Sequence, residues 1–396
     1  MESLRVEQLE LIILVGAMVA IIARRLKFAY TAGLVVAGVV IAFLPIAFNI
    51  PFSKELVFDI LLPPLIFEAA LYIDWKELRK DLVPIAAFAT LGVVLSAVVT
   101  AVVMHYAAGW VWPAAAIFGV LIAATDPVSI IATFKEAKVT GRLRLLVEAE
   151  SLFNDATAAV AFFVVVAVVG GQQVGGGIVA WKLVSSSVGG VLCGLIVGGG
   201  VLLIIGRTRD HLVELSMTTL AAFGSFWLAE HFGLSGILAT TTAGLLIGNL
   251  TVFGPITEKG GQSIEHFWEF AAFVANSVIF VILGINLASQ DFAAASIAIV
   301  VAVLAVMAGR AFAVYPVSAM FAGSSLKIEA KQQHVLFWGG LRGALALALA
   351  LGIPETLPYR QEILTVTFGV VAFSVFVQGL TMRPLLRQFG FIPKST

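Results

Sequence analysis

Acidic and polar side chains interrupt one apolar stretch of this chain in a pattern that could bind a small cation. The stretch EAESLFNDATAAVAFFVVV covers residues 148–166 and carries Ser151 and Asp155 four residues apart, a spacing that puts both on one face of a helix. A second pair with the same spacing, Glu150 and Asn154, lies beside the first. Hydroxyl and carboxylate groups are hard oxygen ligands, unlike the nitrogen and sulfur ligands that transition metals favour. The pattern therefore predicts a site for a small monovalent cation.

Further carboxylates occur in segments that are otherwise apolar. A charge at the centre of a membrane helix costs about 2.5–3.5 kcal/mol on insertion scales, so such residues are candidates for function. Counted along the expected helices, Glu68 and Asp126 come to a depth similar to that of Asp155. We therefore expect carboxylates from three helices to converge, with Asp155, Ser151 and Glu68 as the ligands of the ion.

Two arginines also lie inside apolar segments, where each needs a counter-charge. We expect Glu150 to be the partner of Arg310, with Asp126 as the alternative. Asp126 and Arg342 could otherwise compensate the dipole ends of interrupted helices.

The composition sets the class of protein that must position these residues. Of 396 residues, 60% are hydrophobic and 12% are charged, against about 45–50% and 25% in soluble domains. The composition predicts an all-α polytopic membrane protein that is not an enzyme. The net charge of zero gives no indication of a nucleic-acid partner, and the single cysteine, Cys193, excludes an internal disulfide framework. The N-terminus lacks a positively charged region, so we expect no cleaved signal peptide.

Apolar runs of about 20 residues are long enough to cross a bilayer. Thirteen such runs are predicted, near residues 8–23, 29–47, 55–73, 82–104, 113–133, 148–169, 180–205, 212–230, 234–250, 264–288, 293–321, 334–352 and 361–381. With the N-terminus outside, the inner loops and tail hold 18 of the 24 Lys and Arg residues. The positive-inside rule then predicts an outer N-terminus and a short cytoplasmic tail at 382–396.

The order of the spans suggests an internal repeat. Spans 1–6 and 8–13 would run in opposite directions, which predicts inverted repeats at about 1–170 and 212–381, joined by a linking helix at about 180–205, in one transport domain. Secondary transporters are often built in this way, with the binding site between the repeats.

Spans 5 and 12 hold equivalent positions in the two repeats, and both contain signals for a break. Span 5 carries ATDPVS at 124–129, in which Pro127 removes a backbone donor. Span 12 carries WGGLRGA at 338–344, with three glycines around Arg342. We expect two broken helices that cross near the site.

Competition between two ions at one carboxylate suggests a mechanism. Desolvation disfavours the charged form of a carboxylate, so a shielded Asp155 could hold either a proton or a cation, but not both well. If only the loaded site can face either side of the membrane, exchange of one proton for one monovalent cation is obligatory and moves no net charge. Asn154 would add polarity without a second titrating group.

Four motifs together resemble those of the sodium/proton exchanger family, in the monovalent cation/proton antiporter superfamily: ATDPVS, ESLFNDATAAVAFF, LLPPLIFEAAL and GGLRGALALAL. The resemblance implies thirteen helices, with a dimerisation domain and a mobile core domain that work by an elevator-like movement in a homodimer. The Asn154–Asp155 pair resembles the electroneutral branch of the family.

The resemblance also implies roles for individual residues. Asp155 would bind both the cation and the proton, Ser151 and Glu68 would be further ligands, and a main-chain oxygen near Thr125 would lie in the unwound crossing. The family's glutamate–arginine pair fits Glu150 and Arg310.

These observations lead to one expected function and several alternatives. We expect electroneutral Na⁺/H⁺ exchange without a cofactor, by a protein whose partners are monovalent cations, protons, membrane lipid and a second copy of itself. The location that fits is a prokaryotic inner membrane. The alternatives are K⁺/H⁺ exchange on the same scaffold, a cation channel, and an intramembrane protease that uses Asp126 and Asp155.

Overall fold

The chain folds into helices, as the composition predicts. The computed structural model describes residues 6–26, 28–44, 52–126, 130–131, 133–134, 139–171, 176–250 and 256–392, and these residues contain no β-strand. The long elements are, in chain order, α1 (Val6–Leu26), α2 (Tyr30–Ala42), η1 (Leu56–Leu61), α3 (Leu62–Leu71), α4 (Trp75–Ala87), η2 (Phe88–Gly92), α5 (Val93–Ala107), α6 (Trp112–Leu121), α8 (Arg142–Val169), α9 (Gly176–Ile205), α10 (His211–His231), α11 (Gly236–Leu250), α12 (Glu258–Ala288), α13 (Ser296–Met320), α14 (Ala330–Trp338), α15 (Ala344–Leu351), α16 (Arg360–Phe373), η4 (Ser374–Gly379) and α17 (Leu380–Gln388).

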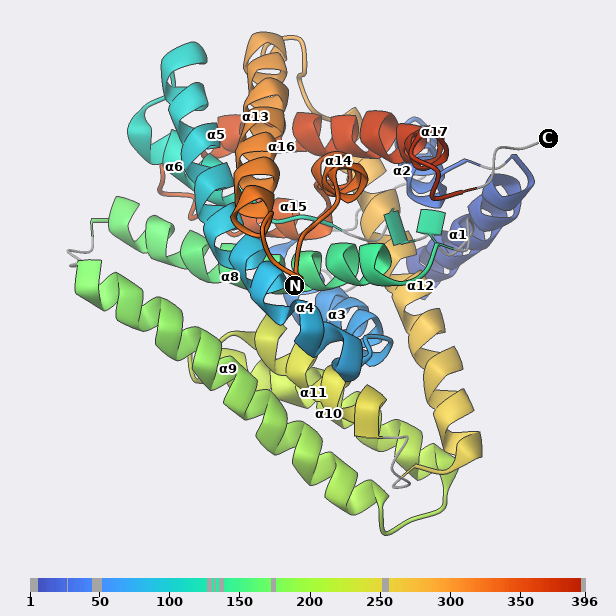
Figure 1. The fold of residues 1–396 in the computed structure, drawn as a ribbon. Helices are drawn as coiled ribbons and strands as arrows, with labels where there is room; N and C mark the ends of the chain where they lie inside the picture. Colours follow the sequence, from blue (N-terminus) through green and yellow to red (C-terminus); the bar gives the residue numbers. More distant parts are fainter. Residues whose placement is uncertain are drawn as a thin grey trace.

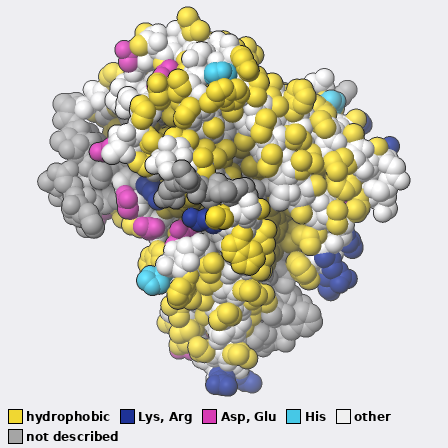
Figure 2. Space-filling model, turned by 90° about the vertical axis from the view of Figure 1, so that its left-hand side faces the viewer, with side chains coloured by type: hydrophobic (Ala, Val, Ile, Leu, Met, Phe, Trp, Pro, Cys, Tyr) yellow, Lys and Arg dark blue, Asp and Glu magenta, His cyan; other side chains and the backbone are white. Residues whose placement is uncertain are grey.

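Many large hydrophobic side chains are exposed, as expected of a surface that faces lipid. Figure 2 shows a face dominated by hydrophobic side chains, with charged side chains confined to a few places. By length and composition, seven helices of the described residues could cross a membrane: 75–107, 142–169, 180–205, 211–231, 258–288, 296–320 and 360–388. Three apolar helices are shorter: Tyr30–Ala42, Trp112–Leu121 and Gly236–Asn249. The chain is therefore a polytopic membrane protein, while the count of thirteen spans stays a prediction.

Several helices begin earlier than their hydrophobic stretches. α8 starts at Arg142 and α12 at Glu258, each six residues before the predicted span. α12 extends to a polar cap, because the side chain of Thr257 accepts a hydrogen bond from the Gly260 amide at 3.0 Å. Hydropathy marks the part of a helix that suits hydrocarbon, whereas caps determine where the helix ends.

Three long helices contain a short π-helical stretch, formed by η1, η2 and η4. Such wide turns change which side chains face a neighbour, and they often occur at functional sites. In η4, the side chain of Gln378 is buried and donates to the carbonyl of Trp338 at 3.1 Å. The π-helical stretch therefore supplies a donor to the end of α14, where the helix leaves its carbonyls without partners.

The helices pack in two groups, with α8 along their boundary (Figure 1). In the first, which we call the α12 group, α12 packs against α1 and α2, and α11 packs against α3, α9 and α10. In the second, the α13 group, α13 packs against α5, α14 and α16, and α5 packs against α6. α8 contacts α4 and α6 on one side and α9 and α11 on the other. A site on α8 is therefore accessible to side chains of both groups.

Candidate ion-binding site

Two interrupted helices cross beside α8. α6 ends at Leu121, and the chain is without regular structure from Ala124 to Asp126. The second helix stops with α14 and resumes with α15, and the amide of Asp126 donates to the carbonyl of Leu341 in the gap at 2.8 Å. The predicted interruption of spans 5 and 12 is confirmed for the described residues. Pro127, the expected cause of the first break, lies outside them.

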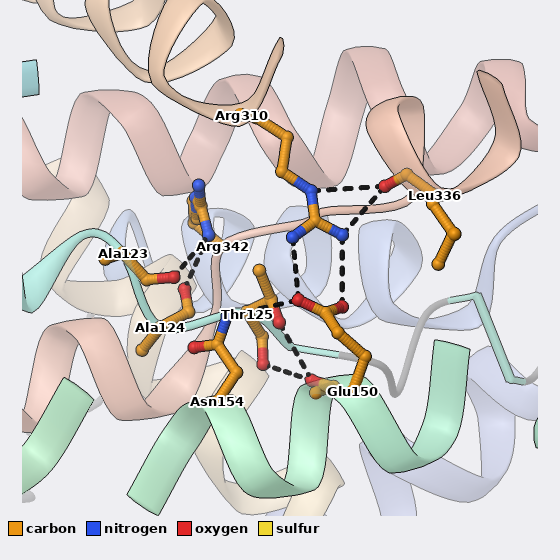
Figure 3. A network of polar contacts seen from close by, with 9 residues as sticks. Ala123, Ala124, Thr125, Glu150, Asn154, Arg310, Leu336 and Arg342 are labelled. Carbon is orange, nitrogen blue, oxygen red and sulfur yellow. Dashed lines mark hydrogen bonds and ion pairs between the residues drawn. The ribbon is translucent and has the colours of Figure 1, made fainter. Parts of the chain in front are cut away.

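Arg342 compensates the partial negative charge at the C-terminal end of α6. Its Nη1 donates to the carbonyls of Ala123 and Ala124, each at 2.9 Å, and the side chain is almost fully buried (Figure 3). The C-terminal end of a helix carries a partial negative charge, which a cation stabilises. The contact expected of Arg342 is therefore present.

Two glycines allow the crossing to close around charged side chains. A Cβ atom at Gly343 would collide with the carboxylate of Asp126, and one at Gly340 would collide with the guanidinium of Arg310. Neither glycine has a positive φ, so the need for glycine arises from the close approach of these side chains. The GG and RG pairs in the motif thus provide space for Asp126 and Arg310.

Gly343→Ala is expected to lower stability because the new methyl group must displace Asp126. Overpacking of this kind costs about 1–3 kcal/mol. The midpoint of thermal unfolding in detergent measures the effect. Gly323→Ala is the matched control, because a Cβ there meets no atom within 4 Å. Equal midpoints for the two variants would contradict the tight contact at Gly343.

Arg310 and Glu150 form a buried, bidentate ion pair. Nη1 and Nη2 of Arg310 donate to the two carboxylate oxygens at 2.8 and 3.0 Å, and the side chains are 6% and 3% exposed. Nε and Nη2 also donate to the carbonyl of Leu336 at 3.2 and 2.8 Å (Figure 3). The predicted choice of Glu150 as the partner of Arg310 is confirmed by this contact. The pair joins α8 to α13 and to α14.

The polar residues of α8 hold the helix against the crossing. Ser151 donates to the carbonyl of Thr125 at 2.5 Å, and the hydroxyl of Thr125 donates back to Ser151 at 3.1 Å. Asn154 donates from Nδ2 to Glu150 at 3.2 Å, so the expected pairing within α8 is also present. These contacts fix the position of α8 relative to the break after α6.

A cavity of about 500 Å³ is lined in part by Asp155. Its walls include the three carboxylates that were expected to converge, Glu68, Asp126 and Asp155. Ser151, Asn154 and Thr125 are not among the described residues that line it. In the part of the chain that the structure describes, no three His, Cys, Asp or Glu side chains are grouped as metal ligands. The three carboxylates therefore share a cavity without forming a closed cage.

The crossing contains several buried polar atoms without a hydrogen-bond partner among the described residues. They are Oδ1 of Asp155, Oδ1 of Asn154, and Nε and Nη2 of Arg342. Buried polar atoms normally have partners, and the exceptions often mark a place where an ion or water binds. The backbone amide of Thr125 does bond to the Asp155 carboxylate, so the side chain is held at the crossing with one oxygen left over. This arrangement suits a small cation or a proton.

Sequence reasoning missed the wall of the cavity that α12 forms. α12 contributes His266, Glu269, Phe273 and Asn276, which recur every three or four residues and so lie on one helix face. The signal available in the sequence was the helical spacing of the polar members of this stripe. Glu148 also lines the cavity and is paired with Arg144 at 2.6 Å.

Comparisons with known proteins show the family to which the chain belongs. A model of the family described as sodium/hydrogen exchanger, transmembrane, matches residues 11–388. The Na(+)/H(+) antiporter ApNhaP of Aphanothece halophytica is 37% identical over 368 residues, which cover 92% of this chain and 70% of that protein. The low-affinity Na(+)/H(+) antiporter NhaS1 of a Synechocystis strain is 36% identical, with 98% of this chain and 76% of that protein covered.

A solved structure is similar in fold. The sodium proton antiporter MjNhaP1 of Methanocaldococcus jannaschii superposes with a TM-score of 0.77 at 20% identity, covering 96% of this chain and 98% of that one. The fold, the motifs and the match over nearly the whole sequence lead to one assignment. This chain is a member of the sodium/hydrogen exchanger family.

Proposed function

We propose that this protein is a Na⁺/H⁺ antiporter that exchanges the two ions at Asp155. The observation that carries the proposal is the Asp155 carboxylate, which lines a cavity and has a buried oxygen without a hydrogen-bond partner among the described residues. The named relatives are Na⁺/H⁺ antiporters, which favours Na⁺ over K⁺ as the transported cation.

The charges around the crossing support exchange without net charge movement. Asp126, Glu150 and Asp155 face two arginines, Arg310 and Arg342, so one negative charge is left when all three carboxylates are ionised. Binding of one proton or of one Na⁺ at Asp155 changes the charge of the site by one in either case, so the two loaded states carry the same charge. An apolar environment disfavours an uncompensated charge. The empty, charged site would therefore cross the membrane poorly, and the exchange would be electroneutral and obligatory.

The proposed ligands come from both groups of helices. Asp155 binds the proton or the cation, and Glu68 on α3 approaches the same cavity from the α12 group. The Ser151 hydroxyl and the Thr125 carbonyl lie where the crossing meets Asp155, so they are the further proposed ligands. Asn154 orients Glu150, and Glu150, Arg310, Asp126 and Arg342 support the crossing.

Alternating access would move the α13 group relative to the α12 group in an elevator-like way, within inverted repeats and in a homodimer. The distribution of Lys and Arg supports an outer N-terminus and a cytoplasmic C-terminus in a prokaryotic inner membrane. Arg24, near the predicted inner end of α1, lines the cavity, so the cavity would open to the cytoplasm.

Purified protein in liposomes tests the function. A pH gradient is imposed, Na⁺, Li⁺ or K⁺ is added, and the internal pH and the membrane voltage are followed together. We expect Na⁺ to dissipate the gradient without generating a voltage. A current that persists without a proton gradient would indicate a channel, and dissipation by K⁺ alone would indicate K⁺/H⁺ exchange.

Glu68→Gln is expected to weaken the apparent affinity for Na⁺, because it replaces a charged ligand by a neutral one. We expect the KM for Na⁺ to rise roughly tenfold, equivalent to about 1.4 kcal/mol. The same liposome assay over a range of Na⁺ concentrations measures it. Glu355→Gln, at an exposed position, is the control. A KM equal to that of the control would remove Glu68 from the site.

A further inference from the structure

The wall of the cavity that α12 forms carries a polar residue, Asn276, deep in the protein. Four residues of α12 follow one helix face along the cavity, from His266 through Glu269 and Phe273 to Asn276. Ten residues separate His266 from Asn276, which is about 15 Å along the helix axis. In the proposed topology Arg24 and His266 both lie near the cytoplasmic ends of their helices, so Asn276 is the deeper end of the stripe.

Asn276 differs from the other polar residues of this part of α12. Its Oδ1 is buried and has no hydrogen-bond partner among the described residues. The neighbouring Ser277 donates to the carbonyl of Phe273 at 2.7 Å and also contacts the Tyr30 hydroxyl at 2.7 Å. Asn286, on the same helix, donates to the carbonyl of Ile282 at 2.9 Å. Ser277 and Asn286 thus have hydrogen-bond partners, while the amide oxygen of Asn276, a residue that lines the cavity, has none among the described residues.

An amide oxygen in this place can bind a cation without also binding a proton, which a carboxylate cannot do. It is a hard, neutral ligand of the kind found around alkali and alkaline-earth cations. It does not titrate, so it can replace a water of the cation's hydration shell without competing for the proton. A residue of this type would change the binding of the cation and leave the binding of the proton unaltered.

We propose that Asn276 coordinates the transported cation from the α12 wall of the cavity and helps to set affinity and selectivity among alkali cations. The inference rests on the proposed function, since it assigns a cation ligand to the same cavity. It differs from that proposal in giving the α12 group a neutral ligand in addition to the Glu68 carboxylate.

Asn276→Leu tests the proposal, because leucine has a similar size and lacks the oxygen. In liposomes we expect the KM for Na⁺ to rise about tenfold, the effect of losing one ligand worth a factor of ten in affinity. The maximal rate should change less than twofold, and the dependence of the rate on pH at saturating Na⁺ should not shift. The ratio of the KM values for Na⁺ and Li⁺ should change. Asn286→Leu is the matched control and should retain the KM and this ratio.

Asn276→Asp provides a second variant of the same shape in case the leucine variant does not fold. A further carboxylate in the cavity should lower the KM for Na⁺. Unchanged KM values for Na⁺ and Li⁺ in Asn276→Asp, or a fall only in the maximal rate of Asn276→Leu, would overturn the proposal. If the unsubstituted protein moved no protons in response to Na⁺, the proposed function itself would fail. If the unsubstituted protein exchanged Na⁺ for protons and both Asn276 variants had the same KM values as it does, only the role of Asn276 would be rejected.

Discussion

Asp155→Asn is expected to reduce Na⁺-dependent proton movement to the level of empty liposomes. Asparagine has the same shape but neither binds a proton nor carries the charge that attracts the cation, so both halves of the exchange lose their ligand. The initial rate of internal pH change after addition of Na⁺ measures the effect. Turnover that survives the substitution would disprove exchange at Asp155.

The same variant should remain folded. One oxygen of Asp155 is buried without a partner among the described residues, so the native carboxylate gains little from its surroundings in the charged form. We therefore expect the thermal unfolding midpoint of Asp155→Asn to equal or exceed that of the native protein. Asp291→Asn, at an exposed position, serves as the control for both activity and stability. Lost activity accompanied by a much lower midpoint would indicate a structural role instead.

Arg310→Ala is expected to cause the largest loss of stability. It removes one partner of a buried ion pair and leaves the charge of Glu150 uncompensated, which typically costs about 3–5 kcal/mol. It also removes the two hydrogen bonds to the carbonyl of Leu336. Unfolding in denaturing detergent or on heating measures the loss.

A double-mutant cycle separates the ion pair from these other contacts. Glu150→Ala should also be destabilising, because it leaves Arg310 buried without its carboxylate partner. The double variant should lose less than the sum of the two single variants, with a coupling of roughly 1–3 kcal/mol. Additive losses would mean that the short distances between Arg310 and Glu150 carry little energy. Arg142→Ala, which breaks a more exposed pair with Asp81, should have a smaller effect than Arg310→Ala.

The sequence predicted those parts of the site whose residues are out of place in an apolar helix. Arg310 needs a counter-charge, and Glu150 is one of few carboxylates at a suitable depth. The break at 339–343 follows from three glycines and an arginine within an apolar run. In both cases the signal is local, because the cost of an unpaired charge or of glycine in a helix does not depend on the neighbours.

Other parts could not be predicted because they depend on how helices meet. The sequence predicts that Ser151 shares a helix face with Asp155, but it did not predict the hydrogen bond from the Ser151 hydroxyl to the carbonyl of Thr125. Spacing within α8 shows that Ser151 and Asp155 share a face, yet not which partner each finds there. Similarly, the polar stripe of α12 becomes part of the site only because α12 packs beside the cavity. The spacing of polar residues along one helix does not show which other helices pack against it.

The backbone hydrogen bond between Asp126 and Leu341 has a mechanical consequence. Together with the contacts of Arg342, Ser151 and Arg310, it fastens the two broken segments, α8 and α13 into one stiff body. In the proposed elevator-like movement, Asp155 would therefore change sides together with these helices, past α3 and α12, and not through a separate motion of its own ligands.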